Sequence, residues 1–321
     1  MSENKQYYIG IDGGATYIRV AVSDCEGNIL SHIKHYGGAA IYKNDNPQKN
    51  MHDAIMKALE KADVRPSEIF AIGAGIACFD SEEDLKWVNT LIDIDGLDCT
   101  VNYVNDSVVA HFGAFHDESG IIAICGTGSI VLGVDEFGCK IRNFDFDNYA
   151  YSAARHLTQN LINRVVKKEN DLSDREVVSE LLNFFGMESV DEIEPLASVG
   201  KELKDRAKQK QFGEFAKFIT DNALRGSRLS QIVCNDAAGE ICYAIELVGN
   251  HFNHSVVDVS LIGSVANSKY IFERISEILF EKGYRLKQDV LLPEFGGVIL
   301  ALKSAGVMVD ETKLERLRSF M

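Results

Sequence analysis

The sequence has little proline and no long apolar run without charges. Only four of the 321 residues are proline, and no change in composition marks a linker between domains. No uncharged apolar segment reaches the roughly 18 residues that a membrane-spanning helix requires, so we expect no membrane association. The first residues, Met1 to Gln6, are polar, and we expect no secretory leader there.

Cysteine is sparse and forms no recognisable pattern. The seven cysteines are odd in number and scattered, and no C-x-x-C pair occurs among them. This arrangement favours small, reduced core residues over a disulfide or zinc framework. We therefore expect a cytoplasmic protein.

Positive charge is in deficit. The chain carries 33 Lys and Arg against 48 Asp and Glu, which gives a formal net charge of −15. A surface of this sign disfavours binding to nucleic acid or to anionic lipid. It still allows a phosphate ligand, because backbone amides and a metal ion can hold an anion on an acidic protein.

The sequence does contain a three-strand pattern that occurs twice. In each copy a glycine turn joins the first two strands, and an acidic turn with glycine joins the second and third. Such internal similarity predicts two related α/β domains, each opening with a hairpin. The expected strands are 7–12, 17–23 and 29–36 in the first copy, and 120–125, 130–134 and 139–141 in the second.

The remaining pattern places helices and further strands around these hairpins. We expect an N-terminal domain over residues 1–117 and a C-terminal domain over 118–321, with a helical insertion at about 151–250 that offers a face for a homodimer. The other expected elements are helices 50–62, 81–91, 267–282 and 295–305, and strands 69–72, 99–104, 256–262 and 289–292.

Two familiar nucleotide motifs do not fit the glycine-rich segments. A Walker-type loop is absent, because Gly200-Lys201 is followed by Glu202. The segment Gly73 to Cys78 approaches a dinucleotide-binding fingerprint but lacks its third glycine. We interpret it as a loop between a strand and a helix that packs closely on its neighbour.

The repeated hairpins suggest a third nucleotide chemistry. Asp12 directly precedes Gly13-Gly14, where small residues let backbone amides approach phosphate oxygens and a carboxylate can hold Mg²⁺ through water. The second hairpin, Gly126 to Ser129, offers amides and two hydroxyls without charge. Together they predict a polyphosphate site with one hairpin from each domain.

These motifs resemble those of a known superfamily. The segments are Ile9-Gly-Ile-Asp-Gly-Gly-Ala-Thr16, Val104-Asn-Asp-Ser107, Ile124-Cys-Gly-Thr-Gly-Ser129, Leu261-Ile-Gly-Ser-Val-Ala266 and Pro293-Glu-Phe-Gly-Gly297. The set is similar to the acetate kinase–sugar kinase–Hsp70–actin superfamily. Within it, the chain resembles the N-acetylglucosamine kinase / BadF-BadG-BcrA-BcrD ATPase family. This resemblance implies an α/β fold of two actin-like (ribonuclease H-like) domains with an ATP cleft between them.

The resemblance also implies roles for individual residues. Asp106 matches the general base of the related kinases, and its alternative role is to cap the helix that follows. The expected cofactors are ATP and Mg²⁺, with Asp12 on the metal. The expected nucleotide-binding residues are Asp12, Gly13, Gly14, Thr16, Gly126, Thr127, Gly128, Gly263, Ser264, Ala266 and Gly296, and the expected substrate contacts are Gly38, Asn105, Asp106, Asp145 and Asp147.

Two loops depart from the family's pattern. The stretch Gly37 to Tyr42 lacks the usual asparagine, although Asn44 and Asn46 lie close by, and Asn143 to Tyr149 replaces a Gly-Asp-Glu-Gly-Ser stretch. These changes reshape the acceptor pocket and leave the phosphate loops intact. The cysteine spacing of the family's iron–sulfur branch is also absent.

The expected function is therefore phosphoryl transfer. We expect an ATP-dependent kinase that transfers the γ-phosphoryl group of MgATP to a hydroxyl of a small sugar, specifically an N-acetylhexosamine. The alternative is an ATPase or nucleotide-switched binding protein with a non-sugar acceptor or none. A DNA-binding regulator on this fold requires an added helix-turn-helix, for which residues 1–6 leave no room.

Overall fold

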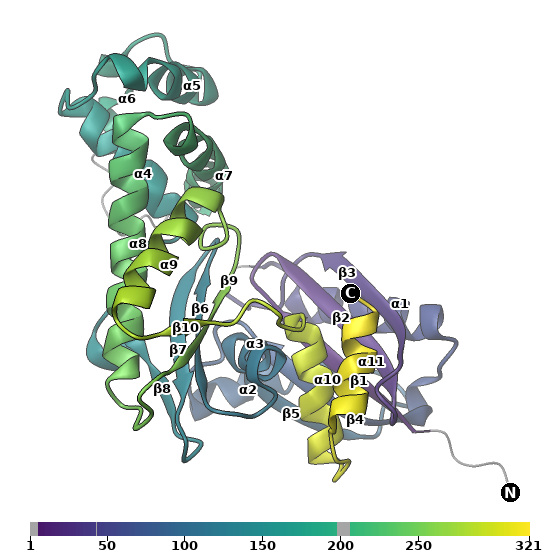
Figure 1. The fold of residues 1–321 in the computed structure, drawn as a ribbon. Helices are drawn as coiled ribbons and strands as arrows, with labels where there is room; N and C mark the ends of the chain where they lie inside the picture. Colours follow the sequence, from purple (N-terminus) through teal and green to yellow (C-terminus); the bar gives the residue numbers. More distant parts are fainter. Residues whose placement is uncertain (1–5, 43, 198–205) are drawn as a thin grey trace, which may run out of the picture. The chain divides into compact units, whose positions relative to one another are not determined.

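The computed structural model describes residues 6–42, 44–197 and 206–321 (Figure 1). The chain divides into two compact units, one formed by residues 1–118 with 289–321, and one formed by 119–288. We call them unit 1 and unit 2. The first boundary lies one residue from the expected one, but residues 289–321 belong to unit 1. The expectation of a single C-terminal domain over 118–321 is corrected in that respect.

Unit 1 contains a five-stranded mixed sheet in the order β3-β2-β1-β4-β5. The first three strands are antiparallel, whereas β4 and β5 run parallel to β1. The strands are β1 (Tyr7–Gly13), β2 (Tyr17–Asp24), β3 (Ile29–Tyr36), β4 (Ile69–Ile76) and β5 (Thr100–Asn105). The segment Gly73 to Gly75 is thus part of β4 and not the expected loop.

Helices cover both faces of this sheet, because its strands present apolar side chains on each face. Ile9 and Ile11 of β1 pack with α1 residues such as Ile55, whereas Tyr8 packs with α10 and α11 on the other face. Figure 1 shows α10 and α11, drawn in yellow-green and yellow, side by side against the sheet. The helices are α1 (Pro47–Ala62), α2 (Leu85–Val88), α3 (Asp106–Phe115), α10 (Pro293–Ser304) and α11 (Glu311–Ser319).

Glycines explain why the C-terminal segment belongs to unit 1. A Cβ on Gly10 of β1 would lie 2.0 Å from the Glu294 carbonyl oxygen, and one on Gly73 of β4 would lie 2.2 Å from that of Gly297. Any larger residue at these positions would force α10 away from the sheet. The backbones of α10, β1 and β4 therefore lie in direct contact.

Unit 2 repeats the same topology. Its five-stranded sheet has the order β10-β9-β6-β7-β8, with β6, β7 and β8 antiparallel and β9 and β10 parallel to β6. This confirms the two related α/β sheets that the repeat predicts. The strands are β6 (Gly120–Cys125), β7 (Ser129–Val134), β8 (Lys140–Arg142), β9 (Asp258–Ile262) and β10 (Arg285–Leu286), so the strand expected over 289–292 is not formed.

The helices of unit 2 form one apolar core with the sheet. Figure 1 shows α5 and α6 at the end of this unit that is remote from its strands. The helices are α4 (Ala154–Val166), α5 (Arg175–Phe185), α6 (Val190–Ala197), α7 (Arg206–Leu224), α8 (Arg228–Gly249) and α9 (Lys269–Glu281).

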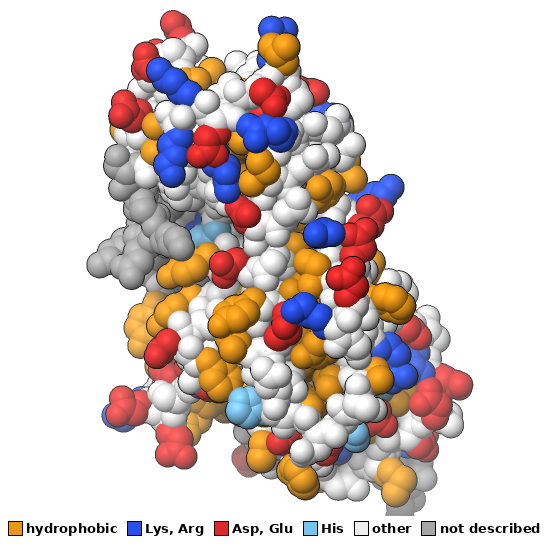
Figure 2. Space-filling view, turned by 60° about the vertical axis from the view of Figure 1, so that its left-hand side comes forward, with side chains coloured by type: hydrophobic (Ala, Val, Ile, Leu, Met, Phe, Trp, Pro, Cys, Tyr) orange, Lys and Arg blue, Asp and Glu red, His pale blue; other side chains and the backbone are white. Residues whose placement is uncertain are grey.

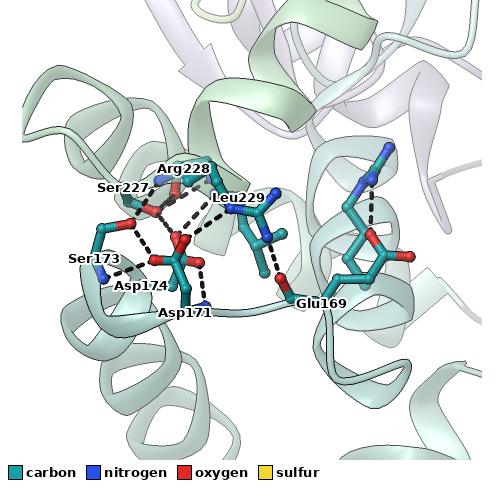
Figure 3. A network of polar contacts seen from close by, with 9 residues as sticks. Glu169, Asp171, Ser173, Asp174, Ser227, Arg228 and Leu229 are labelled. Atoms are coloured by element: carbon teal, nitrogen blue, oxygen red, sulfur yellow. Dashed lines mark hydrogen bonds and ion pairs between the residues drawn. The ribbon is translucent and has the colours of Figure 1, made fainter.

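A buried carboxylate joins the start of α5 to the start of α8 (Figure 3). Asp174 is 0% exposed and accepts hydrogen bonds from Ser227 Oγ at 2.8 Å and from the Leu229 amide at 2.9 Å. Its second oxygen accepts from the Asp171 amide at 2.9 Å. Arg228 in turn donates to Asp171 at 2.9 Å, so the two helix starts share one polar network.

We expect Asp174→Ala to lower the free energy of unfolding by about 3 kcal/mol, because buried donors lose a charged acceptor. Urea denaturation measures this loss. The matched control is Asp221→Ala, which removes an exposed ion pair with Lys217 on α7 and is expected to cost about 0.5 kcal/mol or less. Equal losses in the two variants would contradict a role for the buried network.

Candidate functional site

The parallel strands of unit 1 bring its acidic residues to one edge of the sheet. In the strand register, Asp12 of β1 pairs with Gly75 of β4, and Ile76 of β4 pairs with Asn105 of β5. The carboxyl ends of parallel strands lie at the same edge, where ligands bind in open α/β sheets. Asp12 and the Asn105-Asp106 pair, which lie far apart in the sequence, therefore share this edge.

The first glycine loop is tied to its neighbours through backbone bonds. Gly14 accepts a hydrogen bond from the Ala39 amide at 3.0 Å, and Gly13 accepts one from the Ala77 amide at 2.9 Å. Thr16 accepts one from the Gly37 amide and has an exposed side chain. The loop is held from beneath while its tip stays accessible.

Asn44 fixes the loop that follows β3. Its Oδ1 accepts from the Gly38 amide at 2.9 Å, and its Nδ2 donates to the Ala15 and Ala40 carbonyls at 3.1 and 3.0 Å. Gly38 is buried, and its carbonyl accepts from Asn50 Nδ2 at 3.1 Å. Both polar groups of Gly38, an expected substrate contact, are thus used within the protein.

Asp12 is buried, and its pKa departs strongly from that of an ordinary aspartate. Its side chain is 11% exposed, and Arg19 Nη1 lies 2.6 Å from its Oδ2. Burial raises the pKa of Asp12 to about 7, and the Arg19 guanidinium opposes this rise. The carboxylates of Asp106 and Glu294 add to the rise. Three acids of unit 1 are therefore close enough to interact electrostatically.

Glu294 is a buried acid for which the sequence predicts no role of its own. It lies in the first turn of α10 with 0% exposure, and His32 Nε2 of β3 lies 2.6 Å from its Oε1. Its Oε2 has no hydrogen-bond partner among the residues that the structure describes. An acid between apolar residues in Pro293–Gly297 was the only sequence signal, and its histidine partner is 262 positions away.

The start of α3 shows which residue caps this helix, a role considered for Asp106 besides that of general base. Asn105 is the N-cap, and its Oδ1 accepts from the Ser107 amide at 2.9 Å. Its Nδ2 donates to the Phe79 carbonyl and to Asp80 Oδ1, each at 3.1 Å. Asp106 is the first residue of the helix, so the capping role falls to Asn105 and the Asp106 carboxylate is not the cap.

In unit 2, two glycine-bearing loops follow adjacent parallel strands. The Cys125 carbonyl at the end of β6 accepts hydrogen bonds from the Val265 and Ala266 amides at 3.1 and 3.2 Å. Gly263 has a φ of +100°, and a Cβ there would lie 2.4 Å from the same Cys125 oxygen. Only glycine fits this position, so the Gly126 and Gly263 loops are held together.

The start of α4 anchors the Gly126 loop from the other side. The Gly126 carbonyl accepts from the Ala154 amide at 2.8 Å, and the Thr127 carbonyl accepts from Arg155 Nη1 at 3.1 Å. Thr127 and Gly128 themselves are exposed. The loop thus has a fixed base and an accessible tip, as in unit 1.

A cavity of about 290 Å³ adjoins the Gly263 loop. Asn267 connects the two, because its Nδ2 donates to the Leu261 and Gly263 carbonyls at 3.1 and 3.0 Å. Of the residues expected beside the adenosine, Ser264 is exposed, whereas Ala266 is 0% exposed and packs in the core. The cavity is lined by Ser260, Leu261, Asn267, Phe272, Leu286, Lys287 and Gln288.

Three other residues of the expected site are Gly296, Asp145 and Asp147, and the first two have close contacts within the protein. Gly296 is buried, and a Cβ there would lie 2.0 Å from the Val109 carbonyl of α3, so it lets α10 pack closely on α3, and its nucleotide contact stays a prediction. Asp145 accepts from the Arg142 amide at 2.8 Å and forms an ion pair with its guanidinium at 3.1 Å. Asp147 is exposed, with a φ of +53°.

The acidic edge of unit 1 fits a magnesium ion held mainly through water. Mg²⁺ usually takes one or two protein carboxylates and completes its shell with water and substrate phosphate. Asp12 Oδ1 has no hydrogen-bond partner among the described residues, whereas Oδ2 is held by Arg19. Over the described residues 6–42, 44–197 and 206–321, no three His, Cys, Asp or Glu side chains are arranged to bind a metal directly. One carboxylate plus water is the arrangement that the residues allow.

The surface carries mixed charges. On the face shown in Figure 2, Lys and Arg side chains alternate with Asp and Glu and form no continuous basic area. Among the described helices, none combines the length and the apolar character needed to cross a bilayer. All seven cysteines are free thiols.

Fold and site together define an actin-like ATPase, in which two units of the same topology each place a glycine hairpin at the carboxyl end of their first strand. The chain belongs to the BadF/BadG/BcrA/BcrD ATPase family, whose profile matches residues 9–301. The family resemblance inferred from the motifs is thereby confirmed.

Curated relatives extend along nearly the whole chain. An N-acetylmuramic acid/N-acetylglucosamine kinase of Clostridium acetobutylicum is 22% identical over 92% of this chain and 98% of its own length. Glucosamine kinase GspK of Vibrio cholerae is 23% identical over 94% of this chain and 96% of its own length. A structure from Chromobacterium violaceum, solved as a candidate N-acetylglucosamine kinase, has a TM-score of 0.72 at 18% identity and covers 94% of this chain and 100% of that one.

Proposed function

We propose that this protein is an ATP-dependent kinase that transfers the γ-phosphoryl group of MgATP to a hydroxyl of an amino sugar, most specifically an N-acetylhexosamine. The observation that carries the proposal is the shared edge of unit 1, where Asp12 lies near the end of β1 and Asp106 directly follows the parallel strand β5. The curated relatives support the substrate class, because both are kinases of amino sugars.

The glycine hairpins are proposed to bind the phosphates of the nucleotide. The loop tips, half-exposed at Gly14 and exposed at Thr127 and Gly128, offer backbone that matches phosphate oxygens. Asp12 would hold Mg²⁺ through water, and the ion would neutralise charge on the transferring phosphoryl group. The adenosine would lie against the exposed Ser264 and the adjoining cavity.

Asp106 is proposed to act as the general base. Its carboxylate would accept the proton of the acceptor hydroxyl while that oxygen forms a bond to the γ-phosphorus. The bond between this phosphorus and the bridging oxygen breaks, and ADP leaves with the electron pair. No covalent enzyme intermediate is required, so positioning and charge neutralisation carry the rate.

The proposal is tested by ADP release with MgATP and a panel of acceptors. The panel contains N-acetylglucosamine, N-acetylmannosamine, N-acetylmuramic acid, glucosamine and glucose, with a sample without sugar as the reference. We expect at least one N-acetylhexosamine to raise ADP release about tenfold or more above basal hydrolysis, with a sugar phosphate visible by phosphorus NMR. Release that no acceptor raises would reject the kinase proposal.

One observation favours the second candidate, an ATPase or nucleotide-switched binding protein. The acceptor-side groups of Gly38, Asn105 and Asp145 are all bonded within the protein. A protein of this kind would hydrolyse ATP at a rate that no sugar changes. Hydrogen exchange with and without nucleotide would then show protection changes outside the glycine loops.

A further inference from the structure

We propose that Arg155 is a phosphate-binding residue of unit 2, whose guanidinium pairs with phosphate oxygens of a nucleotide held at the Gly126 loop. The inference rests on the proposed nucleotide site and adds a residue that the glycine motifs do not contain.

Arg155 is held against the accessible tip of the loop. It is the second residue of α4, and its Nη1 donates to the Thr127 carbonyl at 3.1 Å. The preceding residue, Ala154, bonds through its amide to the Gly126 carbonyl at 2.8 Å. Two consecutive residues of the helix therefore contact two consecutive residues of the loop, and the guanidinium is held beside Thr127.

Among the residues that the structure describes, none forms an ion pair with Arg155. Burial alone lowers the pKa of this guanidinium, and no carboxylate of the described residues offsets it. Arg164, which lies further along the same helix, differs in this respect. It pairs with Glu169 at 2.8 Å and with Asp236 at 2.9 Å. A partly buried cation without a counter-ion is costly and is best explained by an anionic ligand.

The surroundings of Arg155 suit a phosphate. The guanidinium has five N–H donors in a planar fork, and only the bond to Thr127 is used within the described residues. The N-terminus of α4 adds the positive end of its dipole, and its N-cap residue Ala153 supplies no side-chain cap. The fork and the start of α4 both lie against the Gly126 loop, whose tip is exposed, and a fork of this kind suits bidentate phosphate binding.

Calorimetric titration of the full chain with ATP, ADP, AMP and adenosine tests this role. Arg155→Gln is expected to weaken ATP binding about 30- to 100-fold, and adenosine binding less than twofold, because only phosphates contact the guanidinium. Arg155→Lys keeps the charge without the fork, and its affinity for ATP is expected to lie between those of the wild type and Arg155→Gln. The control is Arg274→Gln on α9, an exposed arginine paired with Glu277, which should leave all affinities unchanged.

The outcomes separate the possible failures. Equal weakening of ATP and adenosine would show that Arg155 only supports the loop, and an ATP affinity within twofold of wild type would reject the contact. If wild-type protein binds no nucleotide, the proposed function fails as well. Should Arg155→Gln not fold, the ratio of ATP to adenosine affinity in Arg155→Lys gives the same decision.

Discussion

Asp106→Asn is expected to lower kcat for sugar-dependent ADP release by about 10³-fold, the usual range for a lost general base. The substitution keeps the size of the side chain and removes its ability to accept a proton. Because Asn105 caps α3, the helix start should stay intact. We therefore expect ATP affinity and thermal stability to change little, and steady-state kinetics with calorimetry to show the separation.

The control for this experiment is Asp95→Asn, an exposed aspartate of unit 1 at which no change is expected. Full sugar-dependent turnover in Asp106→Asn would show that the base is a different group. A loss of ATP affinity as large as the loss of kcat would point to nucleotide binding as the role of Asp106.

Asp12→Asn is expected to change how stability depends on pH. The folded-state pKa of Asp12 is about 7, against 3.8 for an ordinary aspartate. The folded state therefore binds a proton that the unfolded state has lost, and stability decreases as pH rises through this interval. Between pH 5 and pH 8 the wild type should lose about 2–3 kcal/mol relative to Asp12→Asn, which lacks this titration.

Urea unfolding at pH 5, 6, 7 and 8, without nucleotide or Mg²⁺, measures this difference. A constant gap between wild type and Asp12→Asn across the series would contradict the raised pKa. Under the proposed function the same variant should lose at least about 10²-fold of its Mg²⁺-dependent turnover.

The hairpins of both sheets were predictable because their signals are local. Alternating residues and glycine turns over 7–36 and 120–141 define the strands, and the structure confirms them as β1–β3 and β6–β8. Their repetition also fixes the two-unit organisation. Neither inference depends on contacts between distant segments.

The errors arise where a distant segment decides the outcome. Gly73 was expected in a loop, yet it lies in β4, where it pairs with Gly10 of β1 and where the backbone of α10, more than 200 positions later, packs directly on it. No role was predicted for Glu294 or Arg155 for the same reason. Glu294 contacts His32, and Arg155 contacts the Gly126 loop, only in the folded chain. Single residues without a local pattern carry no sequence signal of their role.

The discontinuous composition of unit 1 has a consequence for biosynthesis. Residues 119–288 are continuous and can fold as soon as they leave the ribosome, whereas unit 1 requires residues 289–321 to complete it. Until α10 is made, the face of β1 and β4 that carries Gly10 and Gly73 stays uncovered. Unit 1 therefore cannot be completed before unit 2 has been synthesised, unlike an N-terminal domain that is continuous in sequence.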